Sequence, residues 1–234
     1  MTKIVGIIGG MGPLASVDLQ RKIIENTVAD EDQDHLHVIT DCNSQIPDRT
    51  AAILHGGKDP LPEMINSAKR LEQAGAQVLV MACNTAHFYL EQMRPAVSIP
   101  FLSMIEAAIE EAKRQDAKRV VIFSTTATQE KGLYELRCQK EGMEVLALSE
   151  EEKELMMRII YAMKAGVMDH GIEEAKALLE RKRQEGADVF FTACTELAIY
   201  FQEDDFVGPF VDPTEALARK VVRYAGGKLK PLTP

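Results

Sequence analysis

The sequence has few cysteines, no long apolar run and no excess of basic residues, and each absence excludes a class of protein. Cysteine occurs four times in 234 residues, and neither Cys-x-x-Cys nor Cys-x-x-His spacing is present. A structural zinc site, which is built on such spacings, is therefore not expected. No stretch approaches the roughly 18 apolar residues of a membrane-spanning helix. The sequence thus predicts neither a zinc-stabilised domain nor an integral membrane protein.

Acidic residues outnumber basic residues by 36 to 27, which gives a net charge of −9. Such a chain lacks the basic surface of a nucleic-acid-binding protein and argues weakly against binding to an anionic membrane. No secretion signal is visible before the apolar run at residues 4–8. We therefore expect a cytoplasmic protein with reduced thiols, and neither nucleic acid nor membrane as its partner.

The composition, 46% hydrophobic and 27% charged, is that of a folded protein. Its length suits one large domain or two small ones. Apolar, β-branched runs alternate with helix-like segments, which is typical of an α/β fold with parallel sheets. The expected strands are residues 3–8, 35–40, 78–81, 119–123 and 145–148. The segment at about 42–62 is expected to be an irregular loop, and long loops of this kind often carry function.

Local signals predict where several helices begin and end. Pro13 opens a helix, Gly75 ends one, and Ser149 with Glu152 forms a capping box for another. Further helices are expected after residue 83 up to Pro95, over 105–113 and 129–140, and from Pro213 onward.

The chain repeats part of its own sequence. Residues 75–83 and 186–194 both read Gly-Ala-x-Val, then three residues, then Ala-Cys, and a threonine follows each soon afterwards. We interpret the repeat as two similar Rossmann-like lobes, related by a pseudo-twofold axis. The predicted lobes are residues 1–99 plus 212–234, and residues 100–211.

Cys83 and Cys194 end the two repeats, each where a strand is expected to give way to a helix. Ligands of parallel α/β proteins bind at this edge of the sheet, and a helix N-terminus favours a thiolate. A single cysteine there is more simply read as a small buried apolar residue, but packing gives no reason for a matched pair. Cys42 and Cys138 have no such counterpart and are interpreted as structural.

Two thiols suit a reaction that inverts a carbon centre. One thiolate removes a proton from one face of the carbon, and the other thiol returns a proton to the opposite face. The two cysteines exchange roles in the reverse reaction, so symmetric lobes would supply symmetric catalytic partners.

Four segments resemble the signatures of the aspartate/glutamate racemase family, and most closely its cofactor-independent aspartate racemases. They are Gly9-Gly10-Met11-Gly12-Pro13, Ile46-Pro47-Asp48-Arg49-Thr50, Ala82-Cys83-Asn84-Thr85-Ala86-His87 and Ala193-Cys194-Thr195-Glu196-Leu197. The resemblance covers nearly the whole chain. It implies two α/β lobes with the active site in the cleft between them, an acidic amino acid as substrate, and a homodimer. It implies neither pyridoxal phosphate nor metal.

The resemblance also assigns site residues. Cys83 and Cys194 become the acid/base pair, and Arg49 and Lys164 match the basic residues that bind substrate carboxylates. The remaining substrate-binding candidates are Met11, Asn84, Thr85, Thr126 and Thr195. Ala127 and Ala193 stand where relatives commonly have glycine, which bears on the shape of the pocket and on the preferred substrate.

Other interpretations compete with this one. Gly10, Gly12 and Ala15 fit a dinucleotide-binding pattern with Asp41 ending the next strand, but Pro13 would remove an N–H group that a pyrophosphate needs. Two further functions fit the same residues. One is a cis–trans isomerase of an unsaturated dicarboxylate, and the second is a dicarboxylate-binding protein without catalytic activity.

Four further polar residues lie near these motifs or on a predicted strand. His87 either tunes the first thiol or is simply packed and hydrogen-bonded, and Glu196 is read as a partner of the helix dipole. His35 and His37 are read as a solvated edge rather than as metal ligands.

Overall fold

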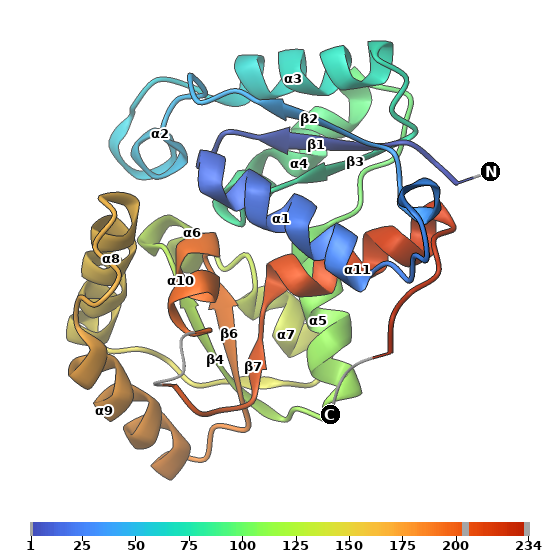
Figure 1. Ribbon diagram of the computed structural model, residues 1–234. Helices are drawn as coiled ribbons and strands as arrows, with labels where there is room; N and C mark the ends of the chain where they lie inside the picture. The colour runs from blue at the N-terminus through green and yellow to red at the C-terminus, as the bar shows by residue number, and fades with distance from the viewer. Residues whose placement is uncertain (1, 203–205, 232–234) are drawn as a thin grey trace. The chain divides into compact units, whose positions relative to one another are not determined.

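The computed structural model describes residues 2–202 and 206–231, and the chain divides into two compact units (Figure 1). Unit 1 comprises residues 1–107 and 214–234, and unit 2 comprises residues 108–213. The divisions fall within helix α5 (Met104–Arg114) and after the first residue of helix α11 (Pro213–Ala225). The lobe boundaries expected from the sequence, at 99/100 and 211/212, stay predictions.

Unit 1 contains a parallel sheet with the strand order β2-β1-β3. The central strand β1 (Val5–Gly9) pairs on one side with β2 (Val38–Cys42) and on the other with β3 (Val78–Met81). Val5 lies opposite both Val38 and Val78 in the two ladders. Because all three strands are parallel, their carboxyl ends lie along one edge of the sheet, where ligands of such folds bind.

Both faces of this sheet are buried by helices. Alternate residues of β1 and β3, among them Ile7 and Val80, pack with α1 (Pro13–Asn26) and α11. The intervening residues, among them Ile8 and Leu79, pack with α3 (Leu61–Gln73) and α4 (Leu90–Met93). Figure 1 shows α1 and α3 on opposite sides of the sheet. The short elements of this unit are α2 (Arg49–His55) and the 3₁₀ helices η1 (Asp32–Asp34), η2 (Thr85–Tyr89) and η3 (Arg94–Ala96).

Unit 2 contains a second parallel sheet with the strand order β5-β4-β6-β7. Its strands are β4 (Arg119–Ser124), β5 (Glu144–Val145), β6 (Val189–Ala193) and β7 (Phe210–Val211). As in unit 1, the first strand in the chain is flanked by the second and the third. The structure thus confirms an α/β fold with parallel sheets, and β3 and β6 are corresponding strands of the repeat.

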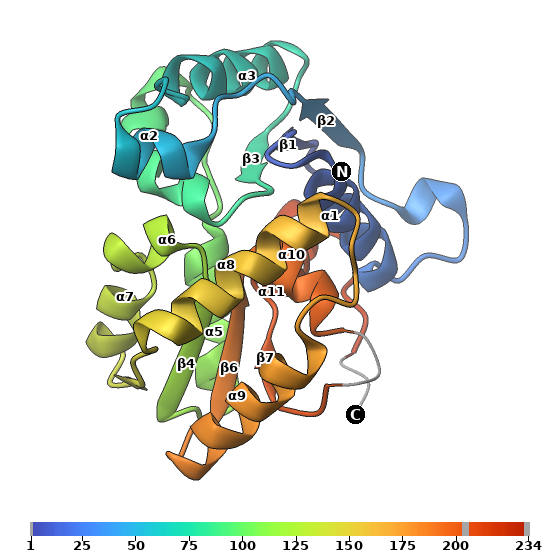
Figure 2. The same ribbon diagram turned by 90° about the vertical axis from the view of Figure 1, so that its left-hand side faces the viewer.

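The core of unit 2 is built around aromatic rings. Phe123 of β4 stacks on Phe190 of β6 at 5.6 Å and on Phe201 at 5.4 Å between ring centroids. The apolar residues of α8 (Glu150–Lys164), α9 (Ile172–Gln184) and α10 (Thr195–Tyr200) cover these rings. Figure 2 looks onto α8 and α9, which lie over β4, β6 and β7. The remaining helices are α6 (Thr126–Glu130) and α7 (Glu135–Lys140).

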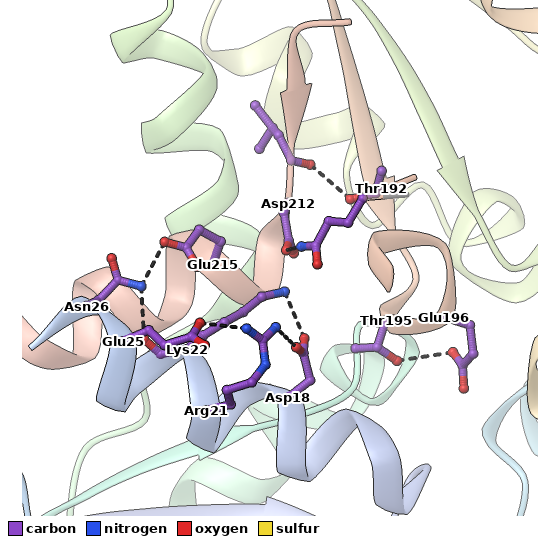
Figure 3. Close-up of polar contacts among 12 residues, drawn as sticks. Asp18, Arg21, Lys22, Glu25, Asn26, Thr192, Thr195, Glu196, Asp212 and Glu215 are labelled. Atoms are coloured by element: carbon purple, nitrogen blue, oxygen red, sulfur yellow. Dashed lines mark hydrogen bonds and ion pairs between the residues drawn. The ribbon is translucent and has the colours of Figure 1, made fainter. Parts of the chain in front are cut away.

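A buried polar cluster fixes α1 to α11 within unit 1 (Figure 3). Lys22 Nζ lies 2.8 Å from Asp18 Oδ2, and both side chains are almost inaccessible to solvent. Asn26 Nδ2 donates to Glu215 Oε1 at 2.8 Å, while Arg219 donates to Asn26 Oδ1 at 2.6 Å. The Lys22–Asp18 pair neutralises buried charge within α1. The contacts of Asn26 with Glu215 and Arg219 join α1 to α11.

The local signals in the sequence are confirmed. Pro13 is the first residue of α1. Gly75, which follows the C-cap of α3, has φ +97°, a backbone conformation that favours glycine. Ser149 and Glu152 form the predicted capping box, with the Ser149 N–H donating to Glu152 Oε2 at 2.8 Å.

The prediction of a continuous irregular loop at 42–62 is wrong, because residues 49–55 form helix α2. Local capping residues mark both ends of this helix. The Asp48 side chain accepts a hydrogen bond from the Ala51 N–H at 2.7 Å, and Gly56 ends the helix with φ +63°. Arg49 is therefore the first residue of a helix rather than part of a loop.

Three other predicted elements differ from the structure. The helix expected over 129–140 is broken into α6 and α7, with Gly132 between them at φ +58°. The strand expected at 145–148 is only Glu144–Val145. The segment after Cys83 begins as the 3₁₀ helix η2 and becomes α-helical only at Leu90. No helix among the described residues is both long and apolar enough to cross a membrane.

Candidate active site

The two cysteines of the repeat occupy matching places in the two units. Cys83 follows β3 after one intervening residue, and Cys194 follows β6 directly. Both side chains are buried, with 7% and 6% of their surface exposed. β3 and β6 each lie beside the central strand of their own sheet. The repeat read from the sequence therefore places each thiol at the carboxyl edge of a sheet.

His87 fixes the main chain at Cys83. Its Nδ1 lies 2.9 Å from the carbonyl oxygen of Cys83, and its Nε2 accepts a hydrogen bond from the Met104 N–H at 3.0 Å. A carbonyl can only accept and an N–H can only donate, so the proton of a neutral ring is on Nδ1. Of the two readings of His87, the structure therefore shows the packed, hydrogen-bonded histidine. Its ring links the end of β3 to the start of α5.

Arg49 and Met11 lie together in unit 1. The Arg49 guanidinium donates to the carbonyl oxygens of Met11 at 3.1 Å, Pro47 at 2.9 Å and Ile46 at 3.3 Å. Arg49 is buried, and its Nε is enclosed without a hydrogen-bond partner among the described residues. Three of the five guanidinium N–H groups thus join the glycine-rich turn after β1 to the segment before α2.

The other candidates of unit 1 share an apolar cluster with Cys83 or follow it in the chain. Met11 and Cys83 belong to one apolar cluster, together with Ile46. Asn84 and Thr85, which follow the cysteine, are both buried. Unit 1 therefore brings its five predicted site residues to one edge of its sheet, as adjacent parallel strands require.

In unit 2, the second thiol contacts a carboxylate. The Cys194 Sγ donates to Glu196 Oε2 at 3.0 Å, and the Thr195 hydroxyl donates to the same oxygen at 3.1 Å. Burial, and after it the charge of Glu196, raise the pKa of the Cys194 thiol well above its ordinary value, while Lys164 acts in the opposite direction. The reading of Glu196 as a partner of the helix dipole missed this contact, although its place two residues after the cysteine was visible in the sequence.

The expectation that a helix N-terminus favours the thiolate is wrong for Cys194. It is the N-cap residue of α10, which has six residues. The partial charge of so short a helix does not offset complete burial beside a carboxylate, because burial penalises the charged form most strongly. After Cys83, the expected α-helix is a 3₁₀ helix whose N-cap is Asn84.

Lys164 and Thr126 are placed less closely around Cys194. Lys164 is the exposed last residue of α8, and its Nζ lies 5.9 Å from the centroid of the Tyr161 ring. Thr126 is the first residue of α6, and its N–H donates to Met157 Sδ at 3.4 Å. Because Ser124 lies opposite Ala193 in the β4–β6 ladder, Thr126 and Cys194 follow adjacent strand ends.

Comparison with known proteins gives a consistent picture. The family model of the Asp/Glu/Hydantoin racemases matches residues 8–221. The broad specificity amino-acid racemase RacX of Bacillus subtilis (strain 168) is 28% identical over 224 residues, which cover 93% of this chain and 96% of that protein. The aspartate racemase of Picrophilus torridus is 31% identical, with a TM-score of 0.85 over 97% of this chain and 96% of its own. An aspartate racemase homologue from Pyrococcus horikoshii OT3 is 28% identical, with a TM-score of 0.79 over 97% of this chain and 100% of its own.

Proposed function

This chain belongs to the Asp/Glu/Hydantoin racemase family, and from that premise we propose that it is a cofactor-independent racemase that interconverts L- and D-aspartate. One observation carries the proposal: Cys83 and Cys194 follow corresponding strands in two units that share their strand order. Inversion of an α-carbon needs a base on one face and an acid on the other. A matched pair of thiols supplies both groups.

The chemical step is a transfer of two protons. The thiolate of one cysteine accepts the α-proton, and the electron pair of the broken C–H bond stays on the α-carbon. The thiol of the other cysteine then gives its proton to the opposite face, forming the new C–H bond and leaving a thiolate. The enantiomer leaves, and the cysteines exchange roles for the reverse reaction. Protons and charges balance without an oxidant or reductant.

A dicarboxylate substrate is supported by the basic groups at the candidate site. The chain carries a net charge of −9, so a dianion needs local positive charge. Arg49 supplies a buried guanidinium, and Lys164 lies close enough to Cys194 to affect its protonation. We propose that these two residues hold the carboxylates. The substrate would also be bordered by Met11, Asn84, Thr85, Thr126 and Thr195. Glutamate is the second substrate to assay, because the Bacillus relative is named as a broad-specificity racemase.

The proposal is tested by proton NMR of L-aspartate in D₂O with the purified protein, followed by chiral chromatography. We expect the α-proton signal to disappear while D-aspartate accumulates. Cys83→Ala and Cys194→Ala should each slow inversion by about 100- to 10,000-fold, which is the usual contribution of a general acid or base. Both substitutions are small, so both variants should fold.

Cys42→Ala is the matched control, because Cys42 is exposed and ends a strand without a counterpart in the repeat. Its activity should equal that of the wild type. A wild-type rate of racemisation in either Cys83→Ala or Cys194→Ala would refute the two-thiol mechanism. Binding of aspartate without any α-proton exchange in the wild-type protein would show a non-catalytic binding protein instead.

A further inference from the structure

Glu196 is the carboxylate in contact with a thiol of the candidate site. Its Oε2 accepts hydrogen bonds from Cys194 Sγ and from Thr195 Oγ1, at 3.0 Å and 3.1 Å. Figure 3 shows the second of these contacts at the start of α10. One carboxyl oxygen accepts both hydrogen bonds, and a thiol that donates must carry its proton. The geometry therefore describes a thiol beside a carboxylate.

The ionised form of Cys194, a thiolate, is unfavourable at this position. A Cys194 thiolate would lie against a carboxylate, and two like charges at this separation repel strongly where water is excluded. Cys194 is only 6% exposed, and Thr195 beside it is 4% exposed. Solvent therefore screens the repulsion poorly.

The other titratable groups near Cys194 do not reverse this preference. Lys164, at the end of α8, favours the thiolate, but burial and the Glu196 charge both outweigh it in raising the pKa of Cys194. Tyr134, which precedes α7, is completely buried with a raised pKa, chiefly because of burial, and so is neutral at physiological pH. Glu196 is thus the nearest charge, and it disfavours ionisation of the thiol.

We propose that Glu196 is a positioning residue that keeps Cys194 protonated in the resting protein. This inference rests on the proposed racemase function, since it assigns the two thiols unequal roles. Cys194 is then the proton donor in the first turnover, and Cys83 is the acceptor.

The proton balance gives Glu196 a second effect. After the α-carbon has taken the proton of Cys194, the new thiolate lies beside the Glu196 carboxylate. The repulsion favours return of a proton to Cys194, either from the next substrate molecule in the reverse direction or from water after release. In this scheme Glu196 acts through Cys194 and is neither the donor nor the acceptor of the transferred proton.

The test compares wild type with Glu196→Gln, which keeps the shape of the side chain and removes its charge. Alkylation of each cysteine by iodoacetamide is followed from pH 6 to 11 by peptide mass spectrometry, since only the thiolate reacts. In Glu196→Gln, the pH midpoint for Cys194 should fall by about one unit, and its alkylation at pH 8 should accelerate about tenfold. The alkaline limb of the pH profile of kcat/KM for aspartate should move to lower pH by a similar amount.

Two further variants make the result specific. Glu196→Asp retains the charge and should keep the midpoint close to that of the wild type. Glu173→Gln removes an exposed carboxylate from the first turn of α9 in the same unit and should leave Cys194 unchanged. Equal midpoints in wild type and Glu196→Gln would overturn the inference, as would an equal shift in Glu173→Gln.

The outcomes separate this inference from the proposed function. Alkylation does not require turnover, so it tests the effect of Glu196 even if no amino acid is racemised. Racemisation with an unchanged Cys194 midpoint in Glu196→Gln would retain the function and remove Glu196 from its role. A shifted midpoint without racemisation would retain the contact and refute the function.

Discussion

A single guanidinium illustrates how much one residue does at this site. Arg49 donates to three backbone carbonyls, two before α2 and one in the turn after β1. A guanidinium can reach several acceptors at once because its five N–H groups diverge in one plane, whereas lysine has a single nitrogen. Arg49 thus combines an architectural role with the binding role that we propose for it.

We predict that Arg49→Lys lowers kcat/KM for aspartate about 10- to 150-fold, because one ammonium group cannot both replace the three carbonyl contacts and hold a carboxylate, and a charge-assisted contact is worth roughly 1.5–3 kcal/mol. Lys164→Leu should have a similar effect on aspartate. Both variants should affect alanine much less, if it turns over, because alanine has no second carboxylate. Steady-state assays on both amino acids check this.

The control for both variants is Arg70→Leu, since Arg70 forms an exposed ion pair with Asp41 in unit 1. It should leave both substrates unaffected. Equal losses on aspartate and alanine in Arg49→Lys would mean that Arg49 does not recognise the side-chain carboxylate.

At the scale of elements, His87 connects the end of β3, where Cys83 lies, to the first residue of helix α5. The ring accepts the first N–H of α5 and donates to the carbonyl of Cys83. Both backbone groups are enclosed by unit 1, where an unpaired donor or acceptor costs free energy. The position of Cys83 therefore depends on the contact between His87 and Met104, which lie 17 positions apart in the chain.

We predict that His87→Ala lowers the free energy of unfolding by about 1–3 kcal/mol, because the Met104 N–H and the Cys83 carbonyl lose their buried partner. kcat should fall as well, since Cys83 is held less firmly. Urea unfolding and initial-rate assays measure the two effects. His37→Ala, at an exposed position, is the control and should change neither quantity. A His87→Ala variant as stable as the wild type would show that the two contacts contribute nothing.

At the scale of the whole molecule, several buried groups resist ionisation at alkaline pH. Burial raises the pKa of Cys138 and of Tyr200 to about 12, and it raises the pKa of Cys194 and Tyr134 as well. In the unfolded chain these groups ionise near their ordinary values of 9.0 for cysteine and 10.0 for tyrosine. Between pH 9 and 12 the unfolded chain therefore binds fewer protons than the folded chain.

We predict that the free energy of unfolding falls steadily as the pH rises from about 9 toward 12, because stability decreases with pH wherever the folded state binds more protons. Urea titrations at a series of pH values would measure the slope. Cys138→Ala should make the slope shallower, whereas Cys42→Ala, at an exposed thiol, should not. A stability that stays constant across this range would contradict the prediction.

The sequence alone determined the order of the elements, the α/β fold and the pair of thiols. These follow from local properties: apolar periodicity, the caps at Pro13 and Ser149, and the repeat that ends at Cys83 and Cys194. Short elements were less predictable. The capping residues of α2 lie in a segment with three prolines, and the break between α6 and α7 depends on the backbone conformation of the single residue Gly132.

Only the tertiary structure decided what the site residues touch and which of them carry protons. The partners of Arg49 include the carbonyl of Met11, 38 positions away, and His87 meets Met104 of another element. Burial of Cys194 among α8, α9 and the aromatic core raises the pKa of its thiol more than Glu196 does. A spacing in the sequence shows that a thiol and a carboxylate are neighbours. Solvent exclusion, which sets the energy of their charges, arises only when distant segments pack around them.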